Sequence, residues 1–195
     1  MSIDHCYPGL KKISRKLMMY GFSMLLTCLV FVTAPPLTNA SASNTKHDAW
    51  SLEIIIPRAL PGKTVVLNSQ TGFQVKLKNI SGKPLNIWKE SNSWGYAMLG
   101  LLLTDSSGRS ITLTRKEKSW RKNFPSAMEI GPGEDYSWNT NLSDKIWDGV
   151  SKLQHNGNYR LQAVLVIPHD DKTSKFNVWT GRVTSAAVGI KYQVK

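Results

Sequence analysis

The sequence predicts an all-β protein, an antiparallel β-sandwich with one short helix, preceded by a signal peptide. Short apolar runs are separated by turn residues about every ten positions, which is typical of sandwiches. Several of these runs alternate apolar and polar residues, the two-residue period of a half-buried strand. About 155 residues follow the expected signal, the size of one ordinary domain. An open antiparallel barrel is the alternative architecture.

The first forty residues have the three parts of a secretory signal peptide. Four basic residues precede the uncharged, mostly apolar run 17–34; they are Lys11, Lys12, Arg15 and Lys16. The chain then passes two prolines and reaches Thr38-Asn39-Ala40, a small-x-small exit. We therefore expect a signal peptide at 1–40, a flexible leader at 41–49, and an exported domain at 50–195 that is periplasmic or secreted.

Two alternatives stay open for this N-terminal segment. The run 17–34 is just long enough to cross a bilayer, so it also predicts an uncleaved membrane anchor. A weaker alternative is lipidation at Cys28, after Leu25-Leu26-Thr27. Cleavage near Ala40 would remove both cysteines, Cys6 and Cys28. The exported domain is then expected to lack disulfides and thiolate chemistry.

The strand predictions follow the apolar runs in order. Expected strands span 50–56, 64–67, 72–80, 84–89, 97–104, 110–115, 135–140, 159–168, 178–184 and 187–194. Two hairpins are predicted, one joining 72–80 to 84–89 and the other joining 97–104 to 110–115. The one expected helix spans 142–153, with Ser143 as its N-cap. Residues 169–177 are expected to be a polar loop.

One local pattern is more specific than the general rhythm. Tyr159 follows the turn Asn156-Gly157 and precedes Leu161 by two residues, as in the tyrosine corner of immunoglobulin-like domains. Together with 77–85, Pro132-Gly133-Glu134 and the run 179–185, this resembles a group of bacterial exported immunoglobulin-like or fibronectin-like domains. The resemblance implies that Tyr159, Leu161 and Trp179 are structural. It also implies an accessory or interaction role, and some relatives of this architecture inhibit proteases through loops.

Charge and aromatic residues suggest the surface that would meet a partner. The chain carries +12 overall, and residues 1–40 hold four basic and one acidic residue, which leaves +9 for the rest. Such a charge favours anionic partners. The candidate ligand-binding residues lie between 115 and 124, where Phe124 is a further aromatic residue; they are Arg115, Lys116, Lys118, Trp120, Arg121 and Lys122. The alternative is a solvated loop whose Trp120 packs back onto the domain.

No motif indicates catalysis, a cofactor or a metal. The sequence lacks the common nucleophile, zinc, phosphate-loop and dinucleotide patterns. His155 and His169 bracket one strand, so we do not expect them to share a site. A second aromatic cluster of Trp88, Trp94 and Tyr96 predicts either a binding rim or core packing. We therefore expect no enzyme activity.

The expected function is that of an exported accessory or binding module of the cell envelope. Its basic aromatic loop would contact an anionic polymer or lipid of the envelope, or the domain would bind another envelope protein. No specific nucleic acid is expected, and a membrane is expected only through an uncleaved signal segment. Two other hypotheses are a proteinase inhibitor acting through end loops and a structural subunit docking through strand edges.

Overall fold

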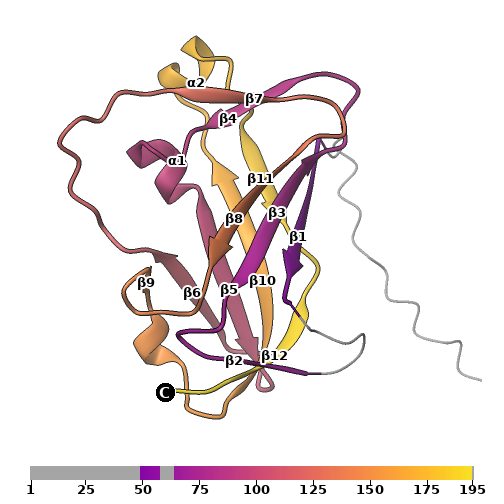
Figure 1. Cartoon of the computed structure of the whole chain (residues 1–195), viewed down its shortest axis with the longest axis vertical. Coiled ribbons are helices and arrows are strands. Elements are labelled where there is room, and N and C mark those ends of the chain that lie inside the picture. Colours follow the sequence, from indigo (N-terminus) through magenta and orange to yellow (C-terminus); the bar gives the residue numbers. More distant parts are fainter. Residues whose placement is uncertain (1–48, 58–63, 195) are drawn as a thin grey trace, which may run out of the picture. The chain divides into compact units, whose positions relative to one another are not determined.

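A computed structural model describes residues 49–57 and 64–194 (Figure 1). Its strands are β1 (Trp50–Ile55), β2 (Val65–Leu67), β3 (Phe73–Asn79), β4 (Leu85–Trp88), β5 (Leu99–Asp105), β6 (Ser110–Arg115), β7 (Ala127–Ile130), β8 (Asp135–Thr140), β9 (Trp147–Asp148), β10 (Asn158–Ile167), β11 (Gly181–Thr184) and β12 (Val188–Tyr192). Its helices are α1 (Ser93–Ala97), α2 (Asp171–Lys175) and the 3-10 turn η1 (Val150–Lys152). The prediction of a mostly β chain is confirmed.

The strands form two larger sheets and one small pair. The first sheet has the order β1-β3-β8, and the second has the order β2-β12-β10-β5-β6-β9 with β11 also paired to β10. Strands β4 and β7 form the third. Among the described strands, β2 and β12 run parallel, and the remaining pairs are antiparallel. The expectation of antiparallel sheets is therefore confirmed.

Alternating side chains of the two larger sheets meet in one core. In β3, Phe73, Val75 and Leu77 are buried, while the polar residues between them are exposed or half-exposed. Leu161 and Leu165 of β10 belong to the same buried cluster. Figure 1 shows β1, β3 and β8 in front of β5 and β10. Burial of one face of each sheet is the main hydrophobic contribution to this fold.

The predicted hairpin 97–104/110–115 is confirmed, with β5 and β6 paired in register from Leu101 opposite Leu113. Its turn is held by Asp105, whose Oδ1 accepts the backbone N–H groups of Ser107 at 2.9 Å and Arg109 at 3.0 Å. The Asp105 carboxyl has a lowered pKa, mainly because the Ser107 hydroxyl also donates to it. These local bonds explain why this hairpin is readable from the sequence.

The other predicted hairpin, 72–80 with 84–89, is wrong. Strand β3 pairs with β1 and β8, while β4 pairs with β7 in the third sheet. Buried Asn79 provides the physical reason, because its Nδ2 donates to Lys83 O at 2.9 Å and to Ile130 O at 2.8 Å. These bonds tie the turn to the end of β7, so the chain leaves the first sheet instead of folding back on it.

The single helix predicted over 142–153 is also wrong. After one turn, in which Ser143 O accepts the N–H groups of Ile146 and Trp147, the chain enters β9 and Trp147 pairs with Arg115 of β6. Gly149 then has a φ of 94°, which a right-handed helix does not permit. Only η1 follows. Apolar residues spaced as on one face of a helix thus lie in two different elements, Trp147 in β9 and Val150 in η1.

Two short α-helices occur where none was predicted. Helix α1 lies in the connection that follows β4, and α2 lies in the expected polar loop 169–177. Asp170 and Thr173 form a capping box at the start of α2: Asp170 Oδ1 accepts Thr173 N–H at 2.7 Å, and Asp170 N–H donates to Thr173 Oγ1 at 2.8 Å. Such reciprocal bonds stabilise a helix start even in a very short helix.

Residues Asn44–Lys195 form one compact unit. Every described member of its buried hydrophobic cluster lies between Trp50 and Tyr192. The predicted signal peptide at 1–40 and nearly all of the predicted leader at 41–49 lie outside the described residues. Among the residues described, no helix is both long enough and apolar enough to span a membrane.

Candidate functional site

The predicted basic aromatic segment connects β6 to β7. We call residues 116–126 the basic loop; Figure 1 shows it as the long connection beside α1. The segment has no regular secondary structure between Arg115 and Ala127. Its shape therefore depends on side-chain and backbone contacts with α1 and with the residues just before it.

Helix α1 is the support for the far half of the loop. Asn123 Oδ1 accepts the Ser93 N–H at 3.0 Å, and Asn123 Nδ2 donates to Ser93 Oγ at 2.8 Å. Three residues further on, Ser126 O accepts Lys89 N–H and Asn92 Nδ2, each at 3.0 Å. The loop is therefore fixed to α1 on both sides of Phe124.

Helix α1 is itself positioned by Asn92 and Gly95. Asn92 is buried and caps the helix, its Oδ1 accepting Gly95 N–H at 3.0 Å. A Cβ at Gly95 would lie only 2.1 Å from Lys89 O, so only glycine fits against this backbone. The sequence analysis missed both residues, although an Asn followed by Ser-Trp-Gly could have indicated a capped turn.

The structure separates Arg115 from the other predicted ligand-binding residues. Its side chain is only 7% exposed and forms an ion pair with Glu90 at 3.1 Å. The guanidinium also lies over the rings of Trp147 at 4.6 Å and Tyr96 at 5.5 Å. Burial lowers the pKa of Arg115, and the charge of Glu90 opposes that shift. Arg115 therefore supports the start of the loop, and a partner cannot reach it.

Trp120 and Lys118 pack onto α1. The ring of Trp120 is half-buried and meets Tyr96 edge to face, with a centroid distance of 5.7 Å. Lys118 Nζ lies 4.9 Å from the Trp120 ring and 5.8 Å from the Tyr96 ring. These cation–π contacts stabilise the near half of the loop. Trp120 thus packs back onto the domain, against Tyr96 of α1, while Lys118 stays exposed.

The remaining basic residues of the loop are exposed. Lys116, Arg121 and Lys122 have no carboxylate within ion-pair distance among the described residues, where the ion pairs are Lys76–Glu53, Arg109–Asp105 and Arg115–Glu90. Lys116 Nζ donates to the backbone oxygen of Asp144 at 3.3 Å. Glu117, also exposed, is the one carboxylate in the loop. The loop thus presents an excess of positive charge to the solvent.

Phe124 lies between the two anchored points of the loop, yet its side chain is not packed. It is 76% exposed, the highest value among the large hydrophobic residues described as exposed. On either side of it, the Asn123 side chain is bonded to Ser93, and the Ser126 backbone oxygen is bonded to Asn92. The exposed ring thus lies in an anchored part of the loop, two and three residues after the exposed Lys122 and Arg121.

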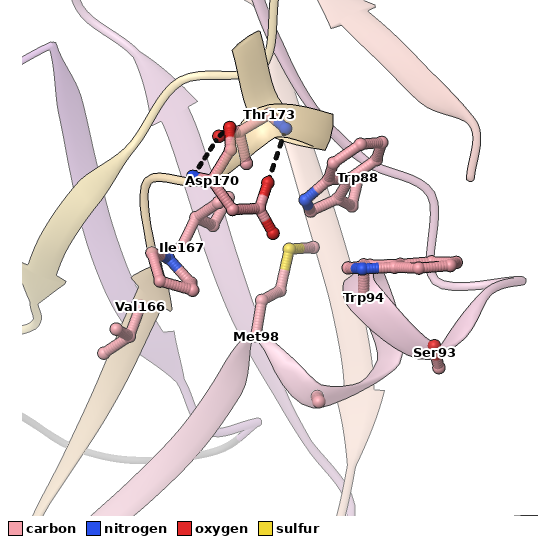
Figure 2. Close-up of a pocket in the computed structure, with 10 residues that line it drawn as sticks. Trp88, Ser93, Trp94, Met98, Val166, Ile167, Asp170 and Thr173 are labelled. Carbon is pink, nitrogen blue, oxygen red and sulfur yellow. Dashed lines mark hydrogen bonds between the residues drawn. The ribbon is translucent and has the colours of Figure 1, made fainter. Parts of the chain in front are cut away.

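A pocket of about 220 Å³ lies on the other side of α1. Its lining includes Trp88, Trp94, Met98 and Asp170, and Figure 2 shows the Asp170 carboxylate pointing toward Met98 and Trp88. Lys172 Nζ lies 4.5 Å from the centroid of the Trp94 ring and so covers part of that ring. The pocket is smaller than those that hold drug-sized ligands, about 300–1,000 Å³. Of the predicted cluster, Trp88 and Trp94 are close together, with ring centroids 6.0 Å apart, whereas Tyr96 packs against Trp120.

The three residues predicted to be structural all make internal contacts. The Tyr159 hydroxyl accepts the backbone N–H of Gln154 at 2.9 Å, five residues upstream. Leu161 is fully buried in the core. Trp179 packs edge to face against Trp50 at a centroid distance of 6.2 Å, and its backbone N–H donates to Asn86 O at 2.8 Å.

The described residues show no cluster suited to metal binding: no three His, Cys, Asp or Glu side chains lie close enough to hold an ion. His155 has a structural contact, its Nδ1 accepting Val194 N–H at 3.0 Å. The Asp170 carboxyl beside His169 caps α2. Its pKa is lowered, mainly by the hydrogen bond from the Thr173 backbone.

Comparison with known proteins does not assign the chain to a family. No protein-family model matches the sequence, and no curated protein matches it significantly.

Proposed function

We propose that this chain is an exported, non-catalytic binding module whose basic loop associates with an anionic component of the cell envelope. One observation carries the proposal: Lys116, Arg121 and Lys122 are exposed and have no carboxylate partner within residues 49–57 and 64–194, on a loop fixed to the domain by α1. Anchoring lowers the conformational entropy that a loop loses on binding. Unpaired cations attract anionic groups and speed encounter with them.

We further propose that the fold is an immunoglobulin-like sandwich. The order β1-β3-β8 corresponds to strands A, B and E, and β12-β10-β5-β6 corresponds to G, F, C and C′. The hydrogen bond between Tyr159 Oη and Gln154 N supports the same assignment, since Tyr159 begins the strand equivalent to F. In domains of this kind, loops commonly carry the binding function while the sheets supply a rigid support.

Export is part of the proposal and is supported by the sequence of residues 1–40, described above. Their basic, apolar and small-x-small regions are those of a secretory signal. The anionic component would then be a polymer or a lipid of the envelope, which the basic loop would meet outside the cytoplasm.

The test measures salt-dependent binding of residues 44–195 to dextran sulfate, a soluble polyanion. The variant K116Q/R121Q/K122Q removes the exposed charges of the loop. A matched control, K78Q/K83Q/K152Q, removes three exposed positive charges elsewhere, so the control and the loop variant have the same net charge. We expect the loop variant to lose most of the binding and the control to lose little. Equal loss in both would mean that net charge alone drives association, and the loop proposal would be rejected.

A further inference from the structure

We propose that the partner of the basic loop is a lipid bilayer containing anionic lipid, and that Phe124 inserts into its interface. This inference rests on the proposed function and names the partner for the same loop. The observation that favours a bilayer is the combination of an exposed aromatic ring and nearby cations. Phe124 is 76% exposed. Arg121 and Lys122, which precede it by three and two residues, are exposed and have no ion-pair partner in the described part of the chain.

A soluble polyanion offers no apolar region in which the exposed phenyl ring could be buried, whereas the interior of a bilayer does. Transfer of a phenylalanine side chain out of water is favourable by about 1.5–3 kcal/mol when it is fully buried. Lys and Arg near an anionic leaflet contribute about 1 kcal/mol each. Burial of the ring and attraction of the cations to anionic headgroups therefore add to each other in reversible binding at the interface.

The loop is preorganised for this contact. Asn123 is bonded to Ser93 on one side of Phe124, and Ser126 O is bonded to Lys89 N and Asn92 Nδ2 on the other. Trp120 is held on Tyr96, which leaves Arg121 and Lys122 between two fixed points. These bonds limit the movement of the loop around Phe124, so little order has to be gained on docking.

The experiment uses residues 44–195, the compact unit that contains the described hydrophobic core, so that the apolar run 17–34 adds nothing to binding. Binding is measured by co-sedimentation with vesicles of phosphatidylcholine alone and of phosphatidylcholine mixed with phosphatidylglycerol. We expect binding to the mixed vesicles only. Phe124→Ser should weaken it about tenfold, and R121Q/K122Q about 20- to 30-fold. The control Ile80→Ser, at another exposed apolar residue, should leave it unchanged.

Insertion is measured separately with a dye. Both cysteines, Cys6 and Cys28, precede residue 44, so Phe124→Cys creates a single labelling site in this unit, and Ile80→Cys creates the control. An environment-sensitive dye at position 124 should shift to the blue with mixed vesicles and stay unshifted with dextran sulfate. The dye at position 80 should stay unshifted with both.

The outcomes separate this inference from the proposed function. Loop-dependent binding to dextran sulfate without binding to mixed vesicles would overturn the bilayer proposal and leave the polyanion function standing. Vesicle binding with an unshifted dye at position 124 would overturn insertion of the ring. Absence of loop-dependent binding to both probes would overturn both proposals.

Discussion

Arg115 and Glu90 form an ion pair at 3.1 Å at the point where β6 passes into the basic loop. The Arg115 side chain is 7% exposed and that of Glu90 is 35% exposed, so the guanidinium has lost most of its hydration. Tyr136 also reaches this pair, its hydroxyl donating to Glu90 Oε2 at 3.4 Å. Burial raises the pKa of Tyr136, and the Glu90 charge adds to that rise. The pair is thus part of the protein's internal support for the loop.

We therefore expect Glu90→Gln to lower the free energy of unfolding by about 1–2 kcal/mol, because a buried guanidinium loses its counter-charge. Urea denaturation at neutral pH measures it. Arg115→Met leaves no buried charge, so combining it with Glu90→Gln should cost less than the sum of the two single changes. Strict additivity would show that the two residues are not energetically coupled.

Gly95→Ala should destabilise the domain by about 2–3 kcal/mol. Its Cβ would meet Lys89 O at 2.1 Å and Lys89 C at 2.4 Å, and backbone atoms cannot yield as a flexible side chain would. Thermal unfolding followed by circular dichroism provides the measurement. Gly82→Ala is the matched control, since a Cβ at Gly82 meets nothing within 4 Å. A stable Gly95→Ala variant would mean that α1 is not packed against Lys89 in solution.

Tyr159→Phe should cost about 1 kcal/mol of unfolding free energy, because the hydrogen bond from Gln154 N–H to the hydroxyl of buried Tyr159 would be lost. The comparison is Tyr96→Phe, whose hydroxyl makes no hydrogen bond within the described part of the chain. Chemical denaturation of both variants should show a loss for Tyr159→Phe that exceeds the loss for Tyr96→Phe. Equal effects would argue against the corner bond.

Asp170 predicts a pH-dependent contribution to stability. Its pKa in the folded protein lies below the ordinary value of 3.8, mainly because the Thr173 backbone donates to the carboxylate. The contribution is therefore present above the ordinary pKa and is lost as pH falls through the lowered one. Asp170→Ala should lower the melting temperature at neutral pH, and the difference from the parent should shrink in strong acid. Asp171→Ala, which removes a neighbouring charge without the cap, should show a smaller difference at neutral pH.

Part of the candidate site was accessible from the sequence. The run from Arg115 to Lys122 is visibly basic and aromatic, and the structure leaves Lys116, Arg121 and Lys122 exposed. Sequence alone could not distinguish Arg115 from these residues, because its burial depends on Glu90, 25 positions away. Nor could it show that Ser93 anchors Asn123 across 30 positions. Contacts of this length leave no local periodicity to read.

The sequence by itself determined the β character of the chain, the β5–β6 hairpin and the start of β10. In each case the relevant signals, alternation and turn residues such as Asp105 and Asn156, act within a few residues of one another. The tertiary structure alone decided that β3 pairs with β8 rather than β4, and that residues 142–153 form a strand and a 3-10 turn. The hydrogen bond from buried Asn79 to Ile130 O directs the chain after β3, and the pairing of Trp147 with Arg115 forms β9. In both places, hydrogen bonds and packing between distant residues outweigh local helix and turn preferences.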